Sequence, residues 1–147
     1  MDGRWYRGAG LVVLAGCHPP MLVPERSDRV AISEAVLQWV ATSSSVRDSR
    51  VFQVRNDSSL AMAEVVDRLR ALDDRLELAD PDPAGYCLTP SGPRTAIVVL
   101  ELPRRRERTA EQAVVLSAGE LAQRFRVRLA WDGTRWQILR LIWEPTT

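Results

Sequence analysis

Side chains that commonly carry out catalysis are scarce in this sequence. The chain has one histidine, His18, two cysteines, Cys17 and Cys87, and no lysine, because all 20 basic residues are arginine. Imidazole and amine groups are the usual general bases and Schiff-base formers, so their near absence leaves mainly carboxylates. The candidate catalytic carboxylates are Asp73, Asp74, Asp80, Asp82, Glu101 and Glu120. The first two end a predicted helix and the next two lie in a proline-rich turn, so we expect no catalytic pocket and no enzyme.

The sequence also offers little for a cofactor or a metal ion. It contains no glycine-rich phosphate loop, no CxxC pair and no metal-ligand spacing, so neither group is predicted. Cys87, beside Tyr86, is more typical of a buried, inert thiol than of a nucleophile. The alternative is a disulfide between Cys17 and Cys87, which requires that Cys17 carry no other group.

Arginine clusters are the main candidates for binding. Four arginines follow Pro103 at the predicted tip between two strands: Arg104, Arg105, Arg106 and Arg108. Such a loop can contact anionic phospholipid, lipopolysaccharide phosphate or a polyanionic glycan, and the alternative is a solvated loop. The same two interpretations apply to a second row: Arg124, Arg126, Arg128 and Arg135. The net charge of +1 gives no general attraction to polyanions, so no nucleic-acid partner is predicted.

The N-terminus has the pattern of an export signal. Arg4 and Arg7 precede an apolar run from Ala9, which ends in Leu14-Ala15-Gly16-Cys17. These last four residues resemble the lipobox of bacterial prolipoproteins. The resemblance implies a diacylglyceryl group on the Cys17 thiol, removal of residues 1–16 as a signal peptide and, usually, acylation of the new amino group. The alternative is that this apolar run forms a buried strand.

A proline-rich segment separates this motif from the predicted domain. Residues 17–27 include Pro19, Pro20 and Pro24, which disfavour helix and predict an extended tether. Ten such residues would span about 30 Å. In enterobacterial lipoproteins, an aspartate after the lipidated cysteine favours the inner membrane. His18 occupies that position here, so the resemblance implies a lipid-anchored protein of the outer membrane that faces the periplasm.

Residues 28–147 are predicted to form a single domain, since a chain of 147 residues suits one folding unit. A first helix, capped by Ser27 or Asp28, has a stripe formed by Ile32, Val36, Leu37 and Val40. A second, capped by Ser58 or Ser59, has a stripe formed by Met62, Val65, Val66, Leu69 and Leu72. Both stripes are expected in the core.

Strand patterns occupy most of the remainder of the domain. The predicted strands are Val51 to Val54, Thr95 to Leu102, Gln112 to Ser117, and the two arms of a hairpin around Asp132-Gly133. A two-residue turn places Trp136 opposite Leu129, on the core face, and Arg128 opposite Gln137, on the wet face.

The predicted fold is α+β, with two N-terminal helices packed on a curved antiparallel sheet that ends in a C-terminal hairpin meander. This layout resembles the NTF2-like or cystatin-like roll and small uncharacterised bacterial lipoproteins, on the closing residues Trp131, Gly133, Arg135-Trp136 and Trp143. The family brings no known activity. We therefore expect a non-catalytic binding or scaffold module, with an envelope protein or an anionic lipid or glycan as partner. The alternative is a roll-type ligand carrier or enzyme with an apolar, cone-shaped pocket.

Overall fold

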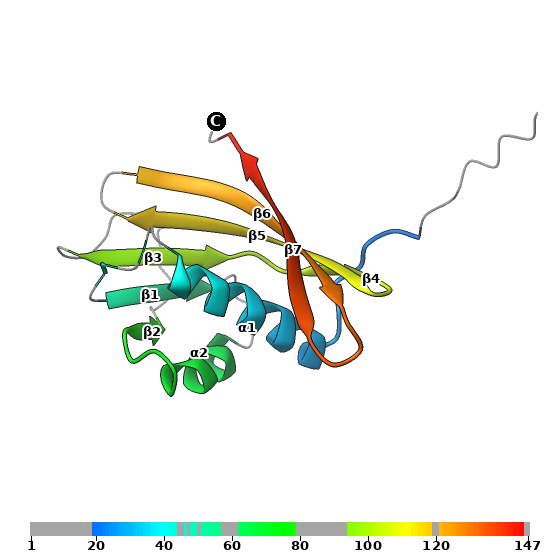
Figure 1. Ribbon diagram of the computed structural model, residues 1–147, viewed down its shortest axis with the longest axis horizontal. Coiled ribbons are helices and arrows are strands. Elements are labelled where there is room, and N and C mark those ends of the chain that lie inside the picture. Colours follow the sequence, from blue (N-terminus) through cyan, green and yellow to red (C-terminus); the bar gives the residue numbers. More distant parts are fainter. Residues whose placement is uncertain are drawn as a thin grey trace, which may run out of the picture.

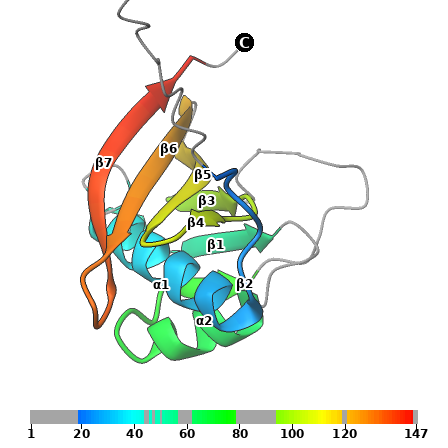
Figure 2. The ribbon, with the colours of Figure 1, turned by 90° about the vertical axis from the view of Figure 1, so that its right-hand side faces the viewer.

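Two helices pack on one face of a curved sheet in the computed structural model, which describes residues 19–43, 46, 48–49, 51–56, 62–78, 94–118 and 121–145 (Figures 1 and 2). The elements are α1 (Arg26–Thr42), β1 (Val51–Asn56), α2 (Met62–Arg70), β2 (Leu76–Leu78), β3 (Thr95–Leu100), β4 (Arg104–Arg106), β5 (Thr109–Ala118), β6 (Leu121–Trp131) and β7 (Trp136–Glu144). The predicted α+β class is confirmed.

The apolar stripes of both helices face the sheet. All four predicted core residues of α1, from Ile32 to Val40, are fully buried. The predicted cap is wrong, because α1 begins at Arg26 and Asp28 lies in its first turn, where a negative charge favours the helix dipole. In α2 the stripe from Met62 to Leu69 is buried, but Leu72 follows the end of the helix and is 74% exposed.

The sheet is larger than the predicted four-stranded meander. Its order is β2-β1-β3-β5-β6-β7, with β4 paired to β5. β1 lies between β2 and β3 and runs parallel to both, whereas the other pairs are antiparallel. β2 and β4 were not predicted from the sequence, because strands of three residues are too short to show a period of two. β3 is buried on both faces, as predicted, and ends at Leu100 rather than Leu102.

The hairpin between β6 and β7 has a different register from the predicted one. Trp136 lies opposite Trp131 rather than Leu129, and the connection is a four-residue loop. Asp132 determines this loop, since its Oδ1 accepts hydrogen bonds from the backbone N–H groups of Thr134 (2.7 Å) and Arg135 (2.9 Å). The register differs by two residues, an even number, so the predicted faces are retained.

Trp136 therefore belongs to the core, as predicted, with 6% of its surface exposed. It packs on the side of β6 that carries Phe125, Val127 and Leu129, against α1. Further along β7 the register shifts by one more residue, at a bulge that contains Leu139. The bulge leaves Leu139 65% exposed on the last strand of the sheet order.

One polar side chain lies within the core. Gln112 of β5 is 1% exposed and donates hydrogen bonds from Nε2 to the Ser33 hydroxyl (3.0 Å) and to the Glu101 carbonyl (2.8 Å). These contacts connect α1 to β5 and to the segment that leads into β4. The Oε1 atom of the same amide is buried without a hydrogen-bond partner among the described residues, so the Nε2 contacts alone fix the orientation of the side chain.

Candidate functional site

Charged side chains gather on the side of the sheet that faces away from α1, called here the outer face. Side chains alternate along β6, so Phe125 points to the helices and its neighbours point outward. Among the described residues, the outer face of β4 to β7 and the adjoining chain carries six arginines and three glutamates. They are Arg104, Arg106, Arg124, Arg126, Arg128, Arg140, Glu101, Glu111 and Glu144.

The strand register aligns these charges in rows across the sheet. One row runs over four strands, through Arg104, Glu111, Arg128 and Arg140, with each residue opposite the next. In a parallel row, Arg124 lies opposite Glu144. Opposite charges that face each other across strands stabilise the pairing, whereas the adjacent Arg128 and Arg140 repel one another.

A continuous chain of ion pairs connects the two rows. Arg124 contacts both Glu101 and Glu144, and its Nε lies 2.8 Å from Glu144 Oε2. Glu144 also contacts Arg126, with 2.5 Å between Oε1 and Nη2. Glu111 then lies between Arg126 (3.8 Å) and Arg128 (2.7 Å). The alternating order neutralises three of the six arginines.

The ion pairs alter the titration of the groups at one end of this chain. Hydrogen bonds to Glu144 and then to Glu101 raise the pKa of Arg124, and the hydrogen bond from Arg124 holds the pKa of Glu144 below its usual range. A general acid or base needs a pKa near the working pH. Glu144 is therefore suited to holding charge and not to moving protons at neutral pH.

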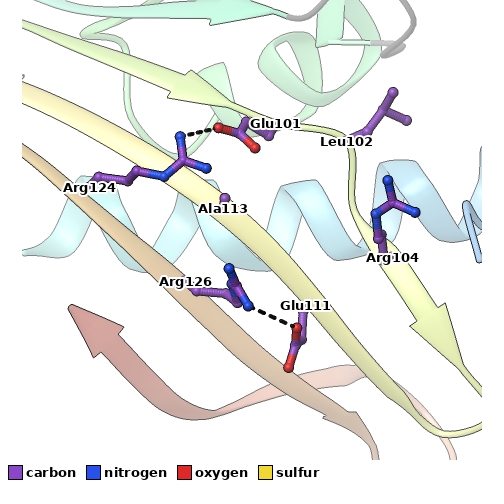
Figure 3. A pocket seen from close by; sticks show the side chains of 7 residues that line it. All are labelled: Glu101, Leu102, Arg104, Glu111, Ala113, Arg124 and Arg126. Carbon is purple, nitrogen blue, oxygen red and sulfur yellow. Dashed lines mark hydrogen bonds and ion pairs between the residues drawn. The ribbon is translucent and has the colours of Figure 1, made fainter. Parts of the chain in front are cut away.

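A shallow hollow of about 200 Å³ lies within the charged face (Figure 3). Its lining residues are Glu101, Leu102, Arg104, Glu111, Ala113, Arg124 and Arg126. Figure 3 shows Arg124 turned to Glu101 and Arg126 turned to Glu111, with the short side chain of Ala113 between the two pairs. Three arginines and two glutamates line the hollow, and Glu144 also pairs with Arg124 and Arg126, so Arg104 is the lining arginine without an ion pair among the described residues.

The structure divides the predicted arginine cluster between two sides of the sheet. The first three arginines form β4 and are not a loop at a tip. Arg104 and Arg106 point to the outer face, whereas Arg105 pairs with Asp28 of α1 and places its guanidinium 5.5 Å from the centre of the Trp136 ring. Arg108 donates hydrogen bonds to the Trp131 carbonyl at 3.1 and 3.3 Å. Arg105 therefore connects β4 to α1 and β7, and Arg108 connects the turn before β5 to the end of β6.

The second predicted row stays together except at its end. The three arginines of β6 share the outer face, but Arg135 lies in the hairpin loop beside Asp132 and its side chain is 77% exposed. Arg140 and the paired roles of Glu111 and Glu144 were not predicted from the sequence. The alternation of Arg and apolar residues in β6 was visible, but the partners depend on the strand register.

Two aspartates considered earlier lie at the turn after α2, where Asp73 has a structural role. The Arg75 guanidinium donates to Asp73 Oδ2 (2.6 Å) and to the carbonyls of Ala41, Val46 and Ser49. The side-chain hydrogen bond from Arg75 lowers the pKa of Asp73. Arg75 thereby links the C-terminal end of α1 to the turn before β2.

Several predictions lie outside the described residues. These concern Cys17, the signal peptide, Ser58, Ser59, Cys87, Tyr86, Asp80, Asp82 and Glu120. Within the described part of the chain, no three His, Cys, Asp or Glu side chains are grouped as metal ligands. Neither described helix has the length and apolar character needed to cross a membrane.

Comparisons with protein-family models, curated proteins and solved structures found no significant match.

Proposed function

We propose that this chain is a lipid-anchored protein of the bacterial envelope whose folded domain binds or scaffolds and does not catalyse. Support for the anchor comes from the sequence, where Arg4 and Arg7, the short apolar run and Leu14-Ala15-Gly16-Cys17 resemble a prolipoprotein signal. By the same resemblance, His18 after the cysteine favours the outer membrane, with the domain in the periplasm.

The charged outer face is the observation that supports binding. Its ion-pair chain uses the three glutamates to hold Arg124, Arg126 and Arg128 in place. The remaining arginines of this face add positive charge without a matching carboxylate among the ion pairs of the described residues. A surface with an excess of positive charge is suited to an anionic partner.

Metabolic labelling with a palmitate analogue tests the anchor. The wild-type chain is expected to incorporate the label, and Cys17→Ser is expected to abolish it because the thiol is the acceptor. Cys87→Ser is the matched control and should label like the parent. A label that survives Cys17→Ser would refute the proposal.

We also propose that the sheet is a roll of the NTF2-like or cystatin-like type. Two helices on one face of a curved sheet and the long β5, β6 and β7 support this assignment (Figure 1). The parallel position of β1 departs from an all-antiparallel roll. An experimental structure with the same strand order and helix placement as a member of that group would support it, and a different connectivity would refute it.

A ligand-carrying roll remains the second candidate, because an open groove of about 500 Å³ lies between α1 and β7. Trp39 of α1 and Trp136 of β7 contribute two aromatic walls, and Ala35, four residues before Trp39 in α1, also lines the groove. An apolar fluorescent probe that binds the parent, and is excluded by Ala35→Arg, would favour this function. Binding that is unchanged by Ala35→Arg would argue against it.

A further inference from the structure

The segment before α1 is attached to the sheet. Leu22 and Arg105 exchange backbone hydrogen bonds, from Leu22 N to Arg105 O (2.9 Å) and from Arg105 N to Leu22 O (2.7 Å). This antiparallel bridge places Leu22 on the side of β4 that does not pair with β5. In Figure 1 the segment before α1 runs beside β4. The extended part of the predicted tether is therefore fixed to the domain at this point.

Attachment at Leu22 limits how far the domain can stand from a lipid on Cys17. Cys17 precedes Leu22 by five residues. At roughly 3.3–3.6 Å per residue, a fully extended chain of that length reaches about 18 Å at most. If Cys17 carries the anchor, as proposed above, β4 and the nearby outer face are held close to the membrane surface.

The outer face beside this attachment carries excess positive charge. Arg104 and Arg106 belong to β4 itself, and Arg140 ends the row that begins at Arg104. None of these three takes part in an ion pair among the described residues. Arg104 and Arg140 are exposed, and Arg106 is half-buried.

Apolar side chains accompany these cations. Met21, the neighbour of Leu22, lines a hollow of about 270 Å³ together with Arg106, Arg128 and Leu139. Leu139 is 65% exposed because the bulge in β7 moves it out of the regular alternation. Leu139 is exposed and Met21 is half-buried, and apolar groups among arginines are typical of surfaces that lie at the boundary between head groups and acyl chains.

We propose that Arg104, Arg106, Arg140, Met21 and Leu139 form a membrane-facing patch that binds anionic phospholipid head groups. The arginines contact the phosphates, and Met21 and Leu139 contact the upper part of the acyl chains. The inference rests on the proposed anchor for the orientation of the domain. The charge of the patch and its apolar side chains, of which Leu139 is exposed, are independent of lipidation.

Vesicle flotation with the full chain carrying Cys17→Ser tests the patch without a covalent lipid. Vesicles of phosphatidylglycerol and phosphatidylcholine are compared with vesicles of phosphatidylcholine alone. Each basic residue at an anionic membrane strengthens binding about fivefold, so Arg104→Gln, Arg106→Gln and Arg140→Gln together should weaken binding on the order of a hundredfold. High salt should weaken parent binding as well.

The matched control removes three arginines elsewhere, through Arg68→Gln, Arg70→Gln and Arg135→Gln. It changes the net charge equally and should retain most of the binding. Leu139→Ser gives a second test without a change of charge, and should weaken binding severalfold. Thermal melts identify any variant that fails to fold, and Arg106→Glu alone then replaces the triple variant.

Three results would overturn the patch. They are equal losses in the two triple variants, no loss in either, or equal binding to vesicles with and without phosphatidylglycerol. Palmitate labelling is read separately on the chain that retains Cys17. If the chain is not labelled but the patch variants still weaken flotation, the anchor is refuted and the patch is retained. If labelling is normal but the patch variants float like the parent, the patch is refuted and the anchor is retained.

Discussion

Substitution of Trp136 tests which face of the C-terminal hairpin is buried in the core. Its side chain is 6% exposed, and its ring centre lies 5.6 Å from that of Trp131. The Arg105 guanidinium lies on the same ring. Truncation of a buried tryptophan to alanine typically costs about 3–5 kcal/mol in the free energy of unfolding. The total stability of a small domain is about 5–15 kcal/mol, so Trp136→Ala should be strongly destabilising.

The indole nitrogen refines this expectation. Trp136 Nε1 is buried and has no hydrogen-bond partner among the described residues. A buried donor without a partner costs about 1–3 kcal/mol. Trp136→Phe removes that donor together with some apolar area, worth about 25 cal/mol per Å². Because the two effects oppose each other, the phenylalanine variant should stay within about 1 kcal/mol of the parent.

Equilibrium denaturation in urea, monitored by circular dichroism, provides the comparison. Arg128→Ala is the control on the outer face, where the side chain is 49% exposed and pairs with Glu111. Exposed ion pairs contribute about 0–1 kcal/mol, so this variant should unfold close to the parent. A parent-like Trp136→Ala together with a strongly destabilised Arg128→Ala would show that the two faces are reversed.

Four further predictions concern structural residues. Arg75→Met should destabilise the chain by about 2 kcal/mol in urea unfolding, since Asp73 and three carbonyls lose a charged donor. The lowered pKa of Asp73 gives stability that is present above the unfolded value of about 3.9 and lost as pH falls through the lower folded pKa. Arg75→Met should reduce that acid sensitivity in a pH series of melts, and an unchanged pH profile would contradict the pairing. Gly133→Ala should cost about 1–2 kcal/mol in urea unfolding because φ is +109° there. Gln112→Glu should destabilise more than Gln112→Leu at neutral pH, because it buries a carboxylate beside the Glu101 carbonyl, and the same melts compare them.

The parts of the fold that follow from periodicity were predictable from the sequence. The stripe from Ile32 to Val40 and the alternation in β6 each predict an element that is buried on one side, and both predictions are confirmed. The turn at Asp132-Gly133 was located correctly, but its length was not. The Asp132 carboxylate accepts hydrogen bonds two and three residues ahead, and this local choice changes the register.

The parts that depend on distant pairing were not predictable. β1 reads as an isolated short strand in the sequence, and only tertiary structure places it between β2 and β3. Arg104, Arg105 and Arg106 are identical in type, yet the pleat of β4 sends the middle one to α1 and the other two outward. Their different roles arise from strand position and not from residue type.

The bulge in β7 has a further consequence for solubility. β7 is nine residues long and ends the sheet order, so it could act as a template for another strand and begin aggregation. The register shift at Leu139 interrupts the regular spacing of its backbone groups, and Arg140 follows it with a charge. An irregular, charged edge is a poor template for cross-β growth. The bulge that exposes Leu139 therefore also disfavours pairing between the β7 edges of two copies of the chain.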